Sequence, residues 1–154
     1  MTTYYLDTSA LSKRYVQETG TAWIRALAAP AANHVLLTAR LTMVEMYSAL
    51  ARRRREGTVP AAMCDVAAHA FTSHSASEYE FVELDAGVVD LAKDLLWRHP
   101  LRAYDAVQLA SALIAERALQ AAGLPPLIFV SADTRLNAAA RDEELAVDNP
   151  NLRS

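Results

Sequence analysis

Four acidic side chains interrupt apolar stretches of the sequence: Asp7, Glu45, Asp105 and Asp133. Asp7 and Asp133 follow the apolar runs 4–6 and 127–130. The other two fall within segments whose pattern predicts apolar helix faces. Burying a carboxylate is costly unless it is paired or holds a metal ion. These positions therefore indicate a shared cation site.

Each acid also has a structural interpretation. Asp7 could simply end a strand, and Asp133 suits the N-cap of a helix, where its carboxylate accepts free backbone N–H groups. Glu45 shares a predicted helix face with apolar neighbours through the i, i+3, i+4 spacing, as does Asp105. A salt bridge to Arg40 or Arg102 would account for such an acid. For four such acids in one chain, one shared cation site is a simpler interpretation than four independent structural roles.

Clustered carboxylates repel one another, which raises some of their pKa values until a cation relieves the repulsion. Oxygen ligands favour the hard ions Mg²⁺ or Mn²⁺. Zinc is disfavoured, because Cys64 is the only cysteine and the four histidines lack ligand spacing. The four glycines stand alone, so no phosphate-binding loop is present. The chemistry that remains is metal-assisted hydrolysis, most naturally of a phosphodiester.

Strands and helices alternate in the predicted pattern. Apolar and period-two runs predict strands over about residues 3–7, 34–37, 79–84, 127–130 and 145–147. Helices are expected over about residues 9–17, 20–29, 42–55, 60–73, 86–97, 101–121 and 134–141, the first of them capped by Thr8 or Ser9 and the last by Asp133. This alternation is typical of an α/β fold with a parallel sheet covered on both faces. In such sheets ligands bind at the carboxyl ends of the strands, where Asp7 and Asp133 fall.

Length and composition set further bounds. A chain of 154 residues with 53% hydrophobic residues is expected to form one domain, residues 1–154, with a substantial core. The start lacks the features of a signal peptide, no run approaches the roughly 20 apolar residues that span a bilayer, and a lone cysteine fits a reducing compartment. We therefore expect a cytoplasmic protein. The net charge of −3 argues against a passive nucleic-acid coat protein but not against a nuclease. Residues 52–55 form a run of four arginines, either a phosphate-binding run or a solvated helix end.

The segments around the acids resemble those of a known family. Residues 7–11, Asp-Thr-Ser-Ala-Leu, resemble the opening motif of PIN-domain ribonucleases, in particular the VapC-type toxins of VapBC toxin–antitoxin pairs. The family's second, third and fourth acids match Glu45, Asp105 and Asp133, each within its own motif. The likeness covers residues 3–150, and the motifs of Asp7 and Asp105 are the most specific in combination.

The resemblance implies a PIN fold with a parallel, twisted sheet of order 3-2-1-4-5 and helices on both faces. It also implies a Mg²⁺- or Mn²⁺-dependent endoribonuclease whose catalytic and metal-binding residues are the four acids. Ser9 would support a metal-binding carboxylate or cap the helix. Apart from the resemblance, Arg102 and Lys13 are the expected contacts of an RNA substrate, because they lie close in sequence to the acids. The partners implied are a small antitoxin, bound along an apolar groove, and a second copy of the chain in a homodimer.

Two other classes of function stay open from the residues. One is a PIN-like module that binds RNA or a protein with little or no catalysis; retention of all four acids favours the enzyme over it. The other is an α/β phosphatase that acts on a small phosphoester. Such a phosphatase would normally carry a second aspartate two residues after the first, where this chain has Ser9.

Overall fold

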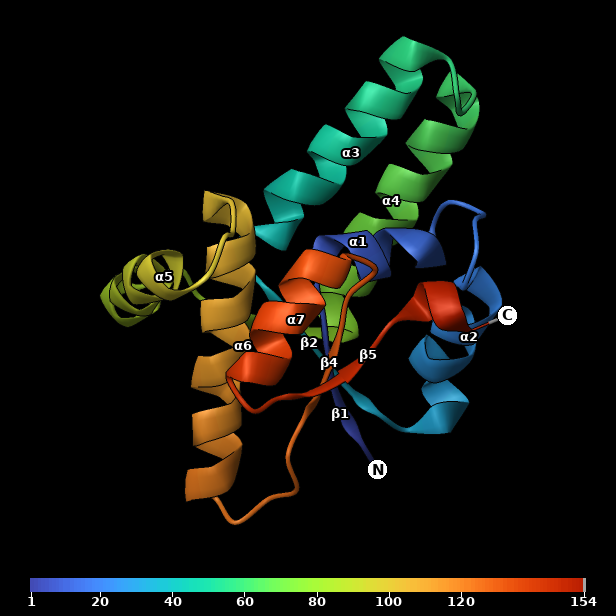
Figure 1. Cartoon of the computed structure of the whole chain (residues 1–154). Coiled ribbons are helices and arrows are strands. Elements are labelled where there is room, and N and C mark those ends of the chain that lie inside the picture. Colours follow the sequence, from blue (N-terminus) through green and yellow to red (C-terminus); the bar gives the residue numbers. More distant parts are fainter. Residues whose placement is uncertain (154) are drawn as a thin grey trace.

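The computed structural model describes residues 1–153, and a five-stranded parallel sheet forms its centre (Figure 1). The strands are β1 (Thr3–Leu6), β2 (Val35–Ala39), β3 (Tyr79–Val82), β4 (Ile128–Val130) and β5 (Ala146–Asp148). Their order across the sheet is β3-β2-β1-β4-β5, and every neighbouring pair is parallel. The predicted α/β class and strand order are therefore confirmed.

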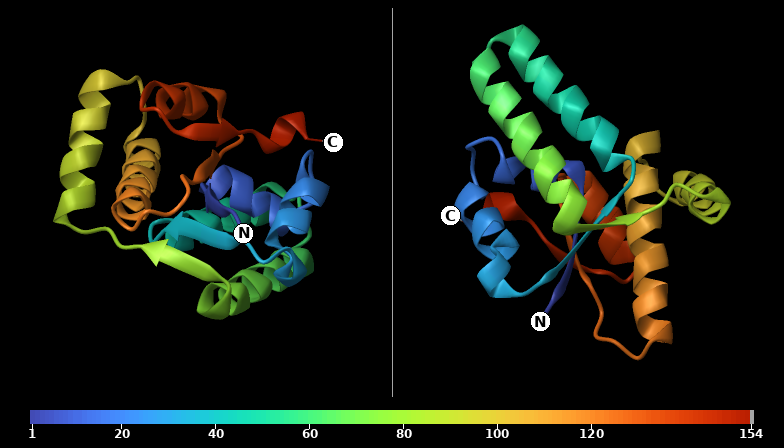
Figure 2. Two further views of the ribbon diagram at one scale, coloured as in Figure 1. Left: turned by 90° about the horizontal axis from the view of Figure 1, so that it is seen from below. Right: turned by 180° about the vertical axis from the view of Figure 1, so that it is seen from behind.

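Helices cover both faces of this sheet (Figure 2). The helices are α1 (Thr8–Leu11), α2 (Thr21–Ala28), α3 (Thr42–Glu56), α4 (Ala61–Ser77), α5 (Ala86–Arg98), α6 (Ala103–Ala121) and α7 (Thr134–Asp142). Side chains of α5, α6 and α7 form the core on one face together with Tyr5 and Phe129, whose rings stack 5.6 Å apart. Side chains of α1 to α4 form the core on the other face around Phe71. Strands β1 to β4 carry apolar side chains on both faces, and burial of both sets produces this three-layer arrangement.

The register between β1 and β4 fixes where the chain leaves the sheet. Leu6 pairs with Val130, so Asp7 and Ser131 emerge side by side at the carboxyl ends of two neighbouring strands. The backbone N–H of Asp7 donates to the carbonyl of Val130 across 3.1 Å. The two central strands thus bring together segments that lie more than a hundred residues apart in the sequence.

The first helix departs from its prediction. The pattern predicted one helix to about Gln17, capped by Thr8 or Ser9, but α1 ends at Leu11 and a 3₁₀ turn (Ser12–Arg14) follows it. The cap is Asp7, whose carboxylate accepts the N–H of Ala10 at 2.9 Å. The predicted cap is wrong because the strand ends one residue earlier than expected, which leaves Asp7 itself at the N-cap. Strand β2 also starts at Val35 and ends at Ala39, two residues beyond its predicted end.

Helices α3 and α4 form a hairpin that projects beyond the sheet (Figures 1 and 2). Helix α3 ends at Glu56, where Gly57 takes the left-handed conformation (φ 71°) that favours glycine after a helix. The arginine run 52–55 therefore forms the last turn of α3, close to the tip of the hairpin. No helix within residues 1–153 has the length and apolar character needed to cross a membrane.

Candidate functional site

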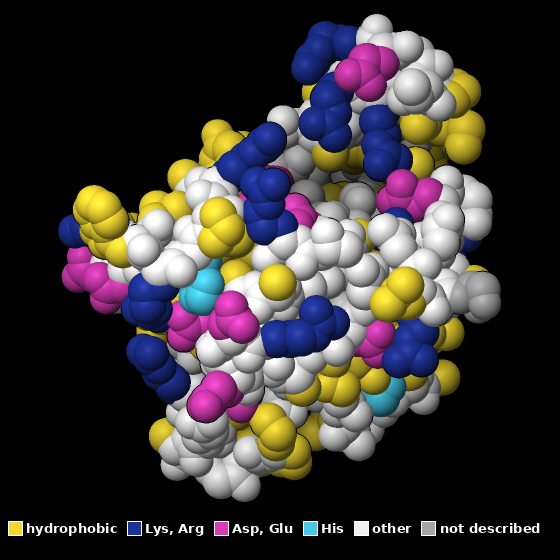
Figure 3. All heavy atoms as spheres, viewed as in Figure 1, with side chains coloured by type: hydrophobic (Ala, Val, Ile, Leu, Met, Phe, Trp, Pro, Cys, Tyr) yellow, Lys and Arg dark blue, Asp and Glu magenta, His cyan; other side chains and the backbone are white. Residues whose placement is uncertain are grey.

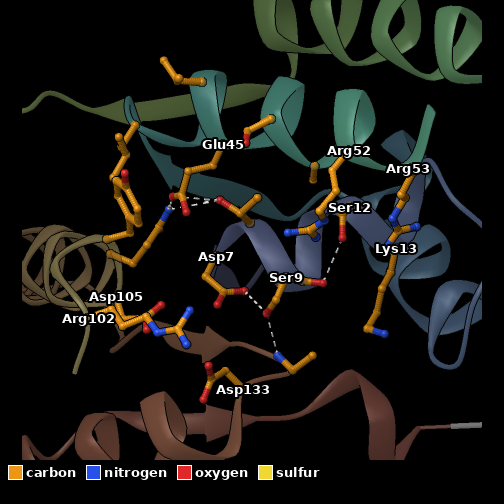
Figure 4. A pocket seen from close by; sticks show the side chains of 18 of the residues that line it. Asp7, Ser9, Ser12, Lys13, Glu45, Arg52, Arg53, Arg102, Asp105 and Asp133 are labelled. Atoms are coloured by element: carbon orange, nitrogen blue, oxygen red, sulfur yellow. Dashed lines mark hydrogen bonds between the residues drawn. The ribbon is translucent and has the colours of Figure 1, made fainter. Parts of the chain in front are cut away.

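The four predicted acids line one cavity of about 580 Å³ at the carboxyl end of the sheet (Figure 4). They come from four elements: Asp7 follows β1, Glu45 lies in the first turn of α3, Asp105 lies in the first turn of α6, and Asp133 caps α7. In Figure 4 the side chain of Asp7 lies between Glu45 on one side and Asp133 on the other. The structure thus places all four acids at one cavity.

Asp7 is the most buried of the four acids, with 4% of its surface exposed. Its Oδ1 accepts hydrogen bonds from the hydroxyl of Ser9 at 2.7 Å and from the N–H of Ala10 at 2.9 Å. Its Oδ2 accepts from the hydroxyl of Ser131 at 2.6 Å. Burial raises the pKa of Asp7 to about 6, although these donors oppose the rise and Asp105 adds to it. The carboxylate is thus held in a fixed position, but it forms no salt bridge with any cation among residues 1–153.

The two serines beside Asp7 also join the ends of β1 and β4. Ser9 accepts the N–H of Ala132 at 2.9 Å, and Ser131 accepts the N–H of Asp133 at 3.1 Å. Two roles were expected for Ser9, support of an acidic side chain or capping of the helix. Its hydroxyl donates to Asp7, and the cap of α1 is Asp7 itself. The same contacts place Asp133 relative to Asp7. The role of Ser131 could not be predicted from the sequence, because its hydroxyl meets Asp7 only through the pairing of β1 with β4.

Glu45 is held by a buried amide that sequence reasoning missed. The side-chain nitrogen of Gln108, on α6, donates to Oε1 of Glu45 at 2.8 Å and to the hydroxyl of Thr42 at 2.9 Å. Its oxygen accepts the hydroxyl of Tyr5 at 2.8 Å, which fixes the orientation of the amide. Thr8 also donates to Oε1 of Glu45, at 3.1 Å. Gln108 is 2% exposed, and the available signal was a polar residue one turn after Asp105, between the apolar residues Val107 and Leu109.

Asp105 and Asp133 complete the acidic lining. Burial raises the pKa of Asp105, and the neighbouring charges of Asp133 and Glu45 raise it further. Oδ1 of Asp133 accepts the N–H groups of Arg135 at 2.9 Å and Leu136 at 3.0 Å. The helix-capping interpretation of Asp133 is therefore confirmed, and the same side chain also lines the cavity. The rise in the pKa of Asp105 that its acidic neighbours cause is expected, because carboxylates that face one space repel one another.

Cationic side chains surround the acids. Lys13 and Arg53 line the cavity and both reach the carboxylate of Glu18 at 3.5 Å. Arg52 and Arg102 line it as well, whereas Arg54 points elsewhere and pairs with Asp65. The structure thus places both predicted substrate contacts, Lys13 and Arg102, at the cavity, but Lys13 is buried and already paired.

The donor set of the cavity suits a hard divalent ion. Within residues 1–153 no three acidic, histidine or cysteine side chains stand close enough together to enclose a metal ion. The four carboxylates instead line one open space, where the charge of Asp105 helps to raise the pKa of Asp7, and the charges of Asp133 and Glu45 help to raise the pKa of Asp105. Mg²⁺ usually keeps several waters and takes only one or two carboxylates directly, so a spread of oxygen donors around an open space fits it.

Comparisons with known proteins agree with the fold. The family model described as the PIN domain matches residues 4–142. No curated protein matches the chain. Three solved structures resemble it: VapBC2 from Rickettsia felis, bound to a promoter DNA fragment; VapC20 of Mycobacterium tuberculosis, a toxin that cleaves the sarcin–ricin loop; and a toxin–antitoxin complex from Klebsiella pneumoniae.

The identity to these three structures is low and the coverage is nearly complete. The Rickettsia structure has 14% identity and a TM-score of 0.62, over 96% of this chain and 98% of its own. The Mycobacterium structure has 17% identity and a TM-score of 0.60, over 88% and 94%. The Klebsiella structure has 14% identity and a TM-score of 0.60, over 96% and 97%. Likeness at this level shows a shared fold.

Proposed function

This chain belongs to the PIN-domain family, and from that premise we propose that it is a divalent-metal-dependent endoribonuclease, the toxin of a toxin–antitoxin pair. The observation that carries the proposal is the convergence of four carboxylates from four elements on one cavity whose rim is lined by arginines. An acidic floor attracts a divalent cation, and a basic rim attracts a polyanion. A site that combines the two suits a nucleic acid as its substrate.

In this proposal Asp7, Glu45, Asp105 and Asp133 hold Mg²⁺ or Mn²⁺, directly or through water. When bound, such an ion would supply Lewis-acid stabilisation of the charge that develops on the phosphate and would make water a better nucleophile. The raised pKa values of Asp7 and Asp105 support the assignment, because a cation relieves the cost of keeping both carboxylates charged.

The remaining side chains position the carboxylates and the substrate. Ser9 and Ser131 hold both oxygens of Asp7, so that this carboxylate cannot rotate away from the cavity. Gln108 and Thr8 both donate hydrogen bonds to Oε1 of Glu45. Oε2 of Glu45 accepts no hydrogen bond among residues 1–153 and is free to face an ion. Arg102 lines the same cavity and offers its guanidinium to a substrate phosphate. Lys13 would contribute mainly through its charge, because it is bound to Glu18.

We predict that Gln108→Leu lowers the free energy of unfolding by about 1–3 kcal/mol, because the hydroxyl of Tyr5 loses its buried acceptor. Cleavage should slow by about 10- to 100-fold, the usual effect of removing a group that orients a metal-binding carboxylate. Urea unfolding in chelator and initial cleavage rates in Mn²⁺ measure the two effects. Gln120→Leu is the matched control, since Gln120 lies on the same helix, is exposed, and its side chain hydrogen-bonds only Glu116 among residues 1–153. Wild-type cleavage by Gln108→Leu would rule out the positioning role.

The toxin assignment also implies partners. A structure of this fold is a toxin–antitoxin complex, and another holds VapBC2 on a DNA fragment from their promoter. By analogy, we propose that this protein binds a small cognate antitoxin and forms a homodimer. A short upstream reading frame that encodes a DNA-binding protein would support the pair. Co-expression of that product should relieve a growth arrest caused by this chain alone, and absence of any arrest would count against the toxin role.

The activity is tested by incubating the purified protein with mixed cellular RNA in Mn²⁺, in Mg²⁺ and in excess chelator. We expect cleavage with either ion and none with chelator. Asp94→Asn serves as the control for loss of an acidic charge, because Asp94 is exposed on α5 and does not line the cavity. An absence of RNA cleavage under all metal conditions would refute the proposed activity.

A further inference from the structure

Three arginines at the site have no ionic partner of their own. Within the described residues 1–153, Arg52 on α3, Arg102 just before α6 and Arg135 on α7 form no salt bridge. Lys13 and Arg53, by contrast, share Glu18. An unpaired guanidinium can bind a phosphate without first breaking an ion pair. The three come from three different elements around the acids.

These arginines lie along a continuous depression. A second cavity, of about 500 Å³, adjoins the first and shares five of its lining residues: Glu45, Arg102, Tyr104, Asp105 and Asp133. Of the two cavities, Arg52 lines only the first and Arg135 only the second, so the two arginines lie on either side of the lining that the cavities share. We call the joined cavities the acidic trough. Figure 3 shows dark blue side chains around the hollow below the α3–α4 hairpin, with magenta at its bottom.

Tyr104 is an aromatic residue of the trough that no internal contact explains. It lies in the first turn of α6, lines both cavities and is 61% exposed. Within residues 1–153 its ring has no aromatic or cationic partner and its hydroxyl makes no hydrogen bond. An aromatic ring that is open to solvent beside phosphate-binding cations is the arrangement on which unpaired bases stack.

We propose that Tyr104 is a stacking platform for an unpaired base next to the cleaved bond, and that Arg52 and Arg135 hold phosphates on either side of it. This inference rests on the proposed ribonuclease function and adds a determinant of specificity. The substrate is then a single-stranded stretch that follows the trough past the acids. In a duplex both faces of each internal base are covered by its neighbours, so Tyr104 could not reach one.

Binding tests the platform independently of cleavage. In the Asp7→Asn background, fluorescence anisotropy would follow a labelled RNA oligonucleotide, either single-stranded or paired with its complement. We expect Tyr104→Ala to weaken binding of the single strand about tenfold, an effect within the range measured for removal of one stacking aromatic. Tyr104→Phe should bind almost as the parent does, because it keeps the ring. Trp97→Ala is the control, since Trp97 is 91% exposed on α5 but does not line the trough.

Steady-state cleavage gives the second readout. In the otherwise wild-type protein, Tyr104→Ala should raise KM for the single strand about tenfold with a smaller effect on kcat. Unchanged binding and KM in Tyr104→Ala, or equal cleavage of the single strand and the duplex, would overturn the inference. If the wild-type protein cleaves no RNA, the proposed function fails, and the anisotropy measurement still decides whether Tyr104 binds a base.

Arg135 gives an independent test of the phosphate contacts. Arg135→Gln should weaken RNA binding and reduce the slope of log affinity against log salt by about 0.7, the amount lost with one phosphate contact on a single strand. Arg141→Gln is the matched control, because Arg141 is exposed on the same helix, forms no salt bridge within residues 1–153 and does not line the trough. Equal slopes for the two variants would show that Arg135 does not contact a phosphate.

Discussion

Asp7→Asn is expected to abolish RNA cleavage and, at the same time, to stabilise the metal-free protein at neutral pH. Cleavage should fall at least about 100-fold, the usual effect of removing one group that stabilises transition-state charge. Stability should rise because asparagine can occupy the same buried position without a charge. A pKa raised from 3.8 to about 6 corresponds to about 3 kcal/mol of differential stabilisation.

The pH dependence follows from the sign of this shift. The unfolded chain binds a proton at Asp7 only below about pH 4, whereas the folded protein keeps it up to about pH 6. The folded state therefore binds more protons between these values, and the wild type loses stability as the pH rises through that window. Asp7→Asn removes this contribution, so its advantage should be largest above pH 6.

Urea unfolding in chelator at about pH 4 and about pH 7.5, together with initial cleavage rates, tests both halves of this prediction. Asp85→Asn is the matched control, because Asp85 caps α5 in the same way as Asp7 caps α1 but lies at an exposed position outside the cavity. It should leave cleavage unchanged, since asparagine caps helices about as well as aspartate. An Asp7→Asn protein that cleaves normally, or is less stable than wild type at pH 7.5, would contradict the assignment.

The second large effect concerns the cation itself. Mn²⁺ at about 100 times its dissociation constant should stabilise the wild type by about 2.7 kcal/mol, because the ion binds the folded state alone. Asp105→Asn should weaken this binding, since Asp105 is one of the carboxylates that line the cavity, and its pKa is raised by burial and then by the charges of Asp133 and Glu45. Loss of one charged oxygen ligand should also reduce cleavage at least about 100-fold.

Calorimetric titration with MnCl₂ and thermal unfolding with and without the ion measure this effect. Binding should tighten as the pH rises through about 6, because the proton on Asp7 must leave before the ion is held. Asp94→Asn should bind Mn²⁺ as the wild type does. Equal ion affinity in wild type and Asp105→Asn would remove Asp105 from the set of ligands.

Much of the fold could be predicted from the sequence because its strands are short apolar runs between clear helix boundaries. All five strands lie within two residues of their predicted ranges. Two helices depart from their predictions: α4 runs to Ser77, beyond its predicted end at about residue 73, and the segment after β1 differs because Ser9 looked like a helix cap. Whether Asp7 or Ser9 caps α1 depends on where the strand ends, and the pairing of Leu6 with Val130 sets that end.

The acids of the site could also be predicted from the sequence, whereas the residues that hydrogen-bond to them and fix their orientation could not. A carboxylate in an apolar stretch stands out because burying it alone is so costly. Gln108 stands out less, since glutamine is an ordinary residue in a long helix, and α6 also carries Gln120. Its contacts with Tyr5 and Glu45 join segments about 100 and about 60 residues apart, and only the packing of α6 against β1 and α3 brings them together.

The chemistry of the cut ends tests the central claim most directly. Wild-type protein would be incubated with a defined RNA oligonucleotide in Mn²⁺, and mass spectrometry would identify the new termini. Metal-assisted attack by water on the phosphorus, with the P–O3′ bond broken and the 3′ oxygen leaving, predicts 5′-phosphate and 3′-hydroxyl ends, and no products in chelator or with Asp7→Asn. Cyclic 2′,3′-phosphate ends, or cleavage that persists in chelator, would contradict hydrolysis by a carboxylate-held metal ion.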